Sequence, residues 1–437
     1  MNVSVISMTG PGKILDRRTV VVCGRRIVVA GPAKTVKVPP GATRIEGAGK
    51  WLMPGLQDMH VHLEHLEDPD FLKLFLAYGV TTVRSMDGRP YVLEWRRAVE
   101  EGELPGPRII TAGPIIDGSP PLREDNLSIP DAETARVAVR RQAAAGYDFI
   151  KVYDRLERDA WSAIITEAKR QELPVAGHVP DEVPLADAIG AHWSIEHITS
   201  FGKAIAAPDG PELPWWAVEL YMAAPVDPER MEALAVRLSA SGVWVVPTLI
   251  ERDRSAGREE AVRTWLSEEG IAELPEWIKT LWQEQNERTA SRLDEGEWPL
   301  IGRGRAHRLA LFRALRKAGV NIAAGTDTPN AFVAPGASLH RELEIYVEAG
   351  LSAGEALMTA TAAPARMLDG AGAGGGRIEP GSEAELILLS SNPLAGLGAL
   401  SELSGVYANG QWYDVEKLDA FKRSMDKPAA SHSGGPN

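Results

Sequence analysis

Short apolar runs separated by helical patterns dominate the middle of the chain. Eight strand-like runs occur, at residues 56–62, 80–86, 107–113, 147–153, 174–178, 193–197, 243–248 and 321–327. Between most of them, apolar residues recur at helical spacing, as in 132–145 and 306–317. Alternating strands and helices are typical of a parallel sheet, and eight strands favour its closure into a barrel. The pattern therefore predicts the α/β class, with a (β/α)8 TIM barrel.

Both ends of the chain have a different, strand-rich pattern with turn residues between the strands. The clearest turn signal is Asn409-Gly410, which lies between two strand-like segments. We expect the two ends to build one small β-sandwich domain, with its first part in residues 1–53 and its second in 373–425. The barrel is then expected in residues 54–372, and residues 426–437, which are polar and rich in Gly, Pro and Ser, form a predicted disordered tail.

A charged, helical insertion is expected at about residues 200–300, inside the barrel. Eight of the twelve tryptophans of the chain fall between residues 193 and 298. Two interpretations stay open for them: extra helices packed on the barrel, or an aromatic lid over a bulky, apolar substrate.

The composition is that of an ordinary globular protein, and it narrows the classes of partner. Of 437 residues, 44% are hydrophobic and 24% are charged. The net charge of −13 repels phosphate backbones, so we expect a small-molecule substrate and no nucleic acid. A single cysteine excludes an intrachain disulfide and fits a cytoplasmic location. No apolar run approaches a membrane span, so no membrane partner is expected, and a homo-oligomer stays open.

Six polar residues lie at or near the carboxyl ends of the predicted strands. His60 and His62 end the first strand, and residues two apart on a strand point to the same face. The carboxyl ends of all barrel strands face one mouth, where active sites lie. Imidazoles that converge there would suit a metal such as Zn²⁺. The sequence therefore predicts a metal site from His60, His62, Lys151, His178, His197 and Asp327.

Lys151 is the unusual member of this set, because it lies in an otherwise apolar strand. Burial of an ammonium is costly, so one interpretation is an ion pair with Asp58 or Glu196. The other is that burial lowers the lysine pKa, and the neutral amine captures CO₂ as a carbamate. A carbamate could bridge two cations, which lie about 3.5–4 Å apart in two-metal sites.

The motifs resemble those of a known superfamily. Residues 50–62 (KWLMPGLQDMHVH) resemble the first-strand signature of the amidohydrolase superfamily, and 195–197 and 325–328 resemble its sixth and eighth strands. Residues 338–343 and 356–365 resemble the segment after strand eight in the imidazolonepropionase-like branch. That branch includes prolidase-like carboxypeptidases and an ochratoxin-hydrolysing amidase. The resemblance covers almost the whole chain and is weakest in the helical insertion.

The resemblance implies a barrel with a small β domain and a centre of two divalent metals, with zinc as the expected metal. His60 and His62 would bind the more buried metal. His178 and His197 would bind the more exposed one. A carboxylated Lys151 would bridge the two.

The resemblance also implies the reaction, which is attack by hydroxide on an amide or peptide-like C–N bond of a small, apolar or aromatic substrate. Asp327 would contact the buried metal, accept the proton of the water and deliver it to the leaving nitrogen. Tyr153 shares a strand face with Lys151, and His340 begins the helix after strand eight. Both are candidate substrate-binding residues.

One departure from the family pattern and three alternatives stay open. Prolidase-like relatives carry a histidine in a loop after strand three, and residues 112–121 contain none, which argues against a dipeptidase. The same machinery could open a cyclic amide, a lactone or a carbamate. A mononuclear deaminase or imidazolonase would not need Lys151. A non-catalytic scaffold is the last alternative, and the presence of all six ligand positions argues against it.

Overall fold

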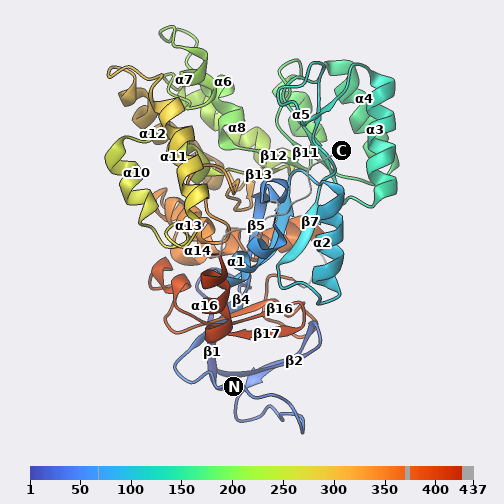
Figure 1. Cartoon of the computed structure of the whole chain (residues 1–437), viewed down its shortest axis with the longest axis vertical. Helices are drawn as coiled ribbons and strands as arrows, with labels where there is room; N and C mark the ends of the chain where they lie inside the picture. Colours follow the sequence, from blue (N-terminus) through green and yellow to red (C-terminus); the bar gives the residue numbers. More distant parts are fainter. Residues whose placement is uncertain (67, 370–374, 426–437) are drawn as a thin grey trace.

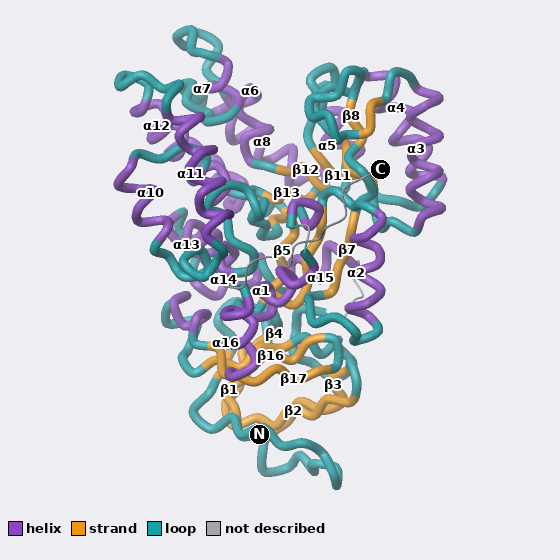
Figure 2. The backbone as a smooth tube through the Cα atoms, in the orientation of Figure 1, coloured by secondary structure: helices purple, strands orange, loops and turns teal. Residues whose placement is uncertain are grey.

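The computed structural model describes residues 1–66, 68–369 and 375–425. A barrel occupies its centre, a mixed β-sheet lies at one end, and most helices lie on either side of the barrel (Figure 1). The tube view separates the strands of the barrel from those of the mixed sheet, which lies next to the N-terminus (Figure 2). The predicted tail, residues 426–437, lies outside the described residues, as does the predicted barrel end at 372.

Eight parallel strands form the barrel in the described part of the chain. They are β5 (Leu56–Val61), β6 (Val80–Ser85), β7 (Arg108–Thr111), β10 (Ile150–Val152), β11 (Val175–Gly177), β12 (Ser194–Glu196), β13 (Trp244–Val246) and β14 (Asn321–Ile322). The strands belong to two hydrogen-bonded sheets, one with β5, β6 and β7 and the other with β10 to β14. Isolated bridges from Ala112 to Phe149 and from Val61 to Thr328 join the two sheets into a closed ring. Each of the eight predicted strands is present, so the barrel prediction is confirmed.

Helices cover the barrel. They are α1 (Leu72–Ala77), α2 (Pro90–Glu100), α3 (Ala132–Ala145), α4 (Arg158–Arg170), α5 (Leu185–Ala191), α8 (Pro228–Ser241), α12 (Trp298–Lys317), α13 (Ala337–Glu348), α14 (Ala353–Thr359) and α15 (Ala362–Asp369). Local sequence explains their ends. Asp131 caps α3 by accepting from the Thr134 amide, and Gly146 ends it with φ at 84°. Ser352 and Glu355 form a capping box at α14.

Further helices lie in the predicted insertion: α6 (Gly202–Ile205), α7 (Trp215–Glu219), α9 (Leu249–Arg254), α10 (Glu259–Leu266) and α11 (Glu276–Ala290). Trp265 and Trp282 pack against Phe332, with ring centroids 5.2 and 5.8 Å apart. Trp215 and Trp277 are exposed. Packing therefore accounts for part of the tryptophan cluster, and a lid over substrate stays a prediction.

The two ends of the chain share one mixed sheet, with strand order β17-β16-β15-β4-β1-β2-β3. Its strands are β1 (Val3–Ile6), β2 (Ile14–Cys23), β3 (Arg26–Pro32), β4 (Trp51–Pro54), β15 (Leu386–Leu389), β16 (Leu403–Ala408) and β17 (Gln411–Asp414), and α16 (Val415–Ser424) follows. The pairing of β15 with β4 joins the two ends. A separate β domain beside the barrel is thus present, and its predicted boundaries stay predictions.

Two very short strands extend the barrel sheet beyond β10. They are β8 (Ile116–Asp117) and β9 (Leu127–Ser128), and residues 118–126 form the loop between them. Short 3-10 helices complete the chain: η1 (Leu63–His65), η2 (Pro69–Phe71), η3 (Ile198–Phe201) and η4 (Leu397–Ser401). Within the described ranges, every helix is too short or too polar to cross a lipid bilayer.

Candidate metal centre

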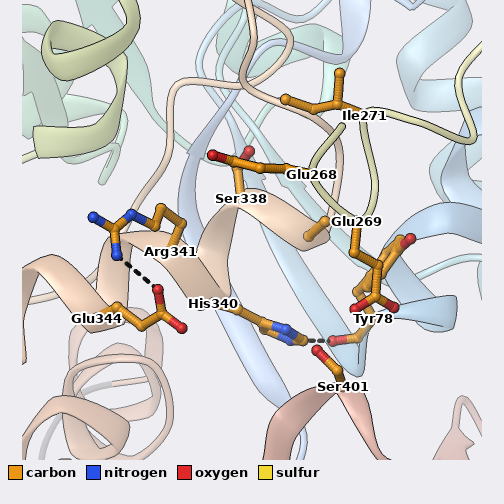
Figure 3. Close-up of a pocket in the computed structure, with 10 residues that line it drawn as sticks. Tyr78, Glu268, Glu269, Ile271, Ser338, His340, Arg341, Glu344 and Ser401 are labelled. Atoms are coloured by element: carbon orange, nitrogen blue, oxygen red, sulfur yellow. Dashed lines mark hydrogen bonds and ion pairs between the residues drawn. The ribbon is translucent and has the colours of Figure 1, made fainter. Parts of the chain in front are cut away.

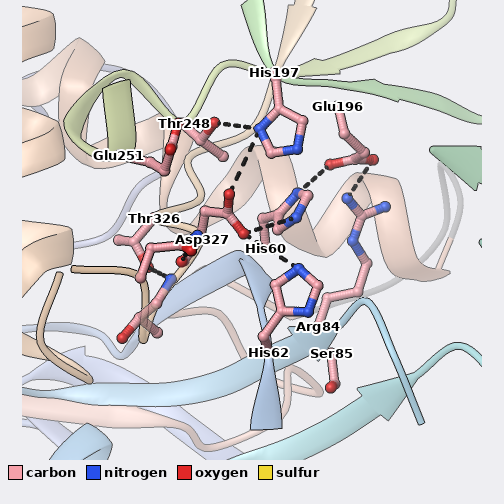
Figure 4. Close-up of polar contacts among 12 residues, drawn as sticks. His60, His62, Arg84, Ser85, Glu196, His197, Thr248, Glu251, Thr326 and Asp327 are labelled. Atoms are coloured by element: carbon pink, nitrogen blue, oxygen red, sulfur yellow. Dashed lines mark hydrogen bonds and ion pairs between the residues drawn. The ribbon is translucent and has the colours of Figure 1, made fainter. Parts of the chain in front are cut away.

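The end of β5 and the segment after β14 bring two histidines and an aspartate together. The Nε2 atoms of His60 and His62 lie 3.3 and 3.2 Å from Oδ1 of Asp327 (Figure 4). Gly325 allows this approach, because a Cβ there would lie 2.8 Å from the His60 amide nitrogen and 2.6 Å from Val246 Cγ1. One ligand atom from each of the three side chains can lie within 4.8 Å of the others. The arrangement can hold a metal ion.

The ends of β11 and β12 bring His178 and His197 to the same place. The ring of His197 lies 4.7 Å from the ring of His60 and 4.8 Å from that of His178, between centroids. Its Nδ1 lies 3.8 Å from Oδ2 of Asp327. The four predicted histidines and the predicted aspartate therefore converge at one barrel mouth.

Lys151 lies on β10 in the same buried region. Its side chain is almost fully buried, and in the described part of the chain Nζ has no hydrogen-bond partner. Burial lowers the pKa of Lys151 to about 8, although the charges of Glu196 and Asp327 oppose this shift. The structure gives the ion-pair alternative no support, because Asp58 hydrogen bonds to Thr326 and Glu196 pairs with Arg84.

Three unpartnered polar atoms mark this region as a metal site. Among the described residues, Nζ of Lys151, Nε2 of His60 and Oδ1 of Asp327 are all buried without a hydrogen bond. Buried polar atoms normally have partners, and each missing one costs about 1–3 kcal/mol. Imidazole nitrogens and a carboxylate oxygen are ligands that zinc prefers, and a lysine carbamate would add two oxygens. The donor set therefore fits a metal centre.

Carboxylates and a hydroxyl fix the orientation of the histidines. Nδ1 of His60 lies 2.8 Å from Oε2 of Glu196, and Nδ1 of His178 lies 2.8 Å from Oδ1 of Asp154. Both bonds leave Nε2 free to face the mouth, which is the usual way a protein orients a metal-binding histidine. Nδ1 of His197 contacts the Thr248 hydroxyl at 2.7 Å.

Glu196 is itself held by a buried arginine that sequence reasoning missed. The Arg84 side chain is fully buried on β6, and its Nη2 donates to Oε1 of Glu196 at 2.7 Å. Arg84 also donates to Ser194 Oγ and to the Met59 carbonyl. Burial acts to raise the pKa of Glu196, but Arg84 and His60 hold it well below its usual range. The carboxylate that orients His60 is therefore permanently charged.

The electrostatics separate the histidines into two groups. Burial acts to lower the pKa of His62, but the carboxylates of Glu64 and Asp327 raise it to about 10. Burial lowers the pKa of His178 and of His197, against the opposing charges of nearby carboxylates. His178 and His197 are thus neutral and ready to bind a cation, whereas His62 must lose a proton first.

Left-handed backbone conformations occur around the mouth. His197, Thr248 and Asp327 have φ values of 62, 47 and 65°. Such conformations are unfavourable for residues with a Cβ, and they persist where the surrounding structure fixes them. Here backbone bonds do so, since the amide of Asp327 donates to the His60 carbonyl at 2.7 Å and that of His197 to Val246 at 2.9 Å. Strain at these positions could not be predicted from the sequence.

Two further side chains border the site. The Tyr153 ring packs on His178 with centroids 4.2 Å apart, and burial raises the pKa of Tyr153 to about 12. Arg123, in the loop after β8, is close enough to Tyr153 and Asp327 to interact electrostatically with both. Sequence reasoning missed Arg123, because nothing distinguishes a single arginine in a polar loop. The structure thus places Tyr153 beside the predicted ligands.

His340, the other predicted substrate residue, lies elsewhere. Its Nε2 is 2.9 Å from the carbonyl oxygen of Tyr78, which precedes the amino end of β6 (Figure 3). His340 and Tyr78 line a pocket of about 270 Å³ with residues such as Glu269 and Arg341. The metal centre lies at the opposite, carboxyl ends of the strands. The structure therefore does not bring His340 together with the six predicted ligands.

Solved structures with the same fold cover nearly the whole chain. A structure described as AH, bottromycin amidohydrolase, is 26% identical, with a TM-score of 0.74 over 97% of this chain and 89% of that chain. A putative prolidase from Bifidobacterium longum is 22% identical, with a TM-score of 0.70 over 97% of both chains. The second likeness shows the fold alone.

Curated relatives match short stretches of the chain. The imidazolonepropionase of Stenotrophomonas maltophilia (strain R551-3) is 43% identical over 63 residues, which is 14% of this chain. These matches span only 14–16% of the length of the first curated relatives. A model of the Amidohydrolase family, in contrast, matches residues 51–413 and so covers the barrel and its ligands. The chain therefore belongs to the amidohydrolase family.

Proposed function

We propose that the chain hydrolyses an amide or peptide-like C–N bond of a small, apolar or aromatic substrate at a centre of two divalent metals. The convergence of four histidines, an aspartate and a buried, unpartnered lysine at one barrel mouth carries this proposal. Family membership supports hydrolysis, and the donor set supports the metals.

Each ligand has a role that its position supports. His60 and His62, next to each other at the end of β5, would hold one cation, and His178 and His197 the other. Lys151 would bridge them after its neutral amine adds to CO₂ and loses a proton. The lowered pKa of about 8 supports this, because it raises the fraction of neutral amine at physiological pH.

Cations bound there would supply a water of lowered pKa and would polarise the carbonyl of the substrate. The chain itself must move the proton. Burial acts to raise the pKa of Asp327, but His60 and His197 hold it well below its usual range, so the side chain is a carboxylate that can accept a proton. We propose that Asp327 accepts the proton of the attacking water and then donates it to the leaving nitrogen.

Metal analysis combined with a hydrolysis screen tests the proposal. The screen uses N-acyl amino acids, dipeptides and aryl amides, with lactones and carbamates as the competing classes. We expect about two zinc ions per chain, turnover of at least one amide, loss of turnover with a chelator and its return with zinc. Two bound metals with turnover confined to lactones would contradict the substrate class.

Lys151 distinguishes this proposal from a mononuclear centre. Lys151→Ala should lower the metal content to about one ion per chain and reduce kcat by a factor of about 100 or more. Lys169→Ala, at an exposed site near the end of α4, is the matched control and should change neither value. Near-normal activity of Lys151→Ala with a single tightly bound metal would favour a mononuclear deaminase or imidazolonase.

A further inference from the structure

The first turn of α9 begins directly after Thr248, in the segment that follows the carboxyl end of β13. A threonine at that place usually caps its own helix, because its side chain accepts a hydrogen bond from an amide of the first turn. Thr248 makes no such bond, and its backbone is left-handed, with φ 47° and ψ 50°. Its hydroxyl lies instead 2.7 Å from Nδ1 of His197 (Figure 4). The residue that would cap α9 therefore contacts a predicted metal ligand.

Glu342, on α13, supplies the missing cap. Its side chain is fully buried, and its two carboxyl oxygens accept from the amides of Leu249 at 2.9 Å and of Ile250 at 2.7 Å. The amides of a first helical turn have no partner within their own helix, so these two bonds satisfy groups that would otherwise be orphaned. Because Leu249 follows Thr248 directly, Glu342 also fixes the backbone at the point where Thr248 turns.

The left-handed conformation of Thr248 depends on support from both sides. A β-branched residue with a positive φ is an outlier that persists only where the surrounding structure holds it. On the side of β13, the amide of Ile198 donates to the carbonyl of Pro247 at 3.1 Å. On the side of α9, the bonds to Glu342 hold the two amides that follow Thr248. Without them the turn can relax, and the hydroxyl of Thr248 then moves away from His197.

We propose that Glu342 is a positioning residue for the metal held by His197. It acts through Thr248: the capped turn keeps the hydroxyl on Nδ1 of His197 and so leaves Nε2 as the nitrogen that binds a cation. Glu342 is not itself a member of the predicted ligand set. The inference rests on the proposed function, because it names the group that holds one of the proposed ligands in place.

Competitive titration of the full chain with zinc and a chelator measures the affinity for each ion. His197→Ala identifies the ion held by His197, because it should weaken that ion alone. Glu342→Leu keeps the size of the side chain and removes both acceptors. It should weaken the same ion by about 10- to 100-fold and leave the ion held by His60 unchanged. Glu342→Gln keeps one acceptor and should weaken the ion by a smaller factor.

A matched control and a double-variant cycle separate this route from a general loss of stability. The control is Glu385→Leu, because Glu385 also accepts from a backbone amide, that of Asn409 at 3.0 Å, but lies beside the mixed sheet. It should change neither affinity. Thr248→Val should weaken the His197 ion much as Glu342→Leu does, and Thr248→Ser, which keeps the hydroxyl, should restore the affinity. If Glu342 acts through Thr248, Glu342→Leu with Thr248→Val should be no weaker than either variant alone.

The outcomes are distinct for the inference and for the proposed function. Effects of the two variants that multiply, equal weakening of both ions, or unchanged affinity of Glu342→Leu would overturn the inference. If Glu342→Leu does not fold, the cycle uses Glu342→Gln with Thr248→Val and the same criteria. Two bound ions with the expected coupling, but no cleavage of any amide, would support the inference and contradict the proposed function alone. Cleavage of an amide with uncoupled variants would do the reverse.

Discussion

Glu196→Gln tests the buried pair that orients His60. The substitution keeps the shape of the side chain and removes the charge that offsets Arg84. Both side chains are 0% exposed, and Nη2 of Arg84 lies 2.7 Å from Oε1 of Glu196. Loss of one partner of a buried ion pair typically costs about 3–5 kcal/mol, because the other charge is left without compensation. We expect a loss of that size in the free energy of unfolding.

Urea denaturation of the metal-free protein near neutral pH measures this loss. The double variant Arg84→Met with Glu196→Gln should recover part of the stability, since it leaves no buried charge without a partner. Glu101→Gln is the control, because Glu101 pairs with Arg97 on the surface and such pairs contribute about 0–1 kcal/mol. A loss for Glu196→Gln no larger than that of Glu101→Gln would refute the reasoning.

Three other predictions follow. Glu196→Gln should also weaken the metal held by His60 by about 10- to 100-fold in a competitive metal titration, because Glu196 no longer fixes the ring. Asp154→Asn should do the same for the metal held by His178, and unchanged affinity in either titration would contradict this. Burial raises the pKa of Glu342 to about 8, so the folded protein keeps a proton that the unfolded chain loses near pH 4.5. The contribution of this retained proton to the free energy of unfolding is complete below about pH 4.5 and is lost as the pH rises through about 8. Glu342→Gln should therefore make the free energy of unfolding, measured by urea denaturation, depend less on pH. An unchanged pH profile in this variant would contradict the prediction.

The strands and the ligands could be predicted because each depends on a local signal. Apolar runs such as 174–178 mark buried strands, and the strand-end rule brings residues such as His178 and Asp327 to one mouth, whatever the helices between them do. The closed ring then follows from the number of strands. The barrel topology therefore accounts for most of the ligand residues that the sequence predicts.

The groups around the ligands depend on tertiary contacts that a sequence does not display. Arg84 is an isolated cation in an apolar strand, and only the fold brings it to Glu196. Arg123 depends on how Asp117 shapes its loop. His340 faces Tyr78, because the long connection between β14 and α13 starts that helix near the amino ends of the strands. Loop geometry was the missing information in the last two cases.

An anomalous diffraction map of crystals grown with zinc tests the central claim most directly. The account predicts two peaks among the six side chains, about 3.5–4 Å apart, with density for a carbamate that extends Lys151 between them. A single peak beside an unmodified Lys151, or peaks away from His60 and Asp327, would contradict it.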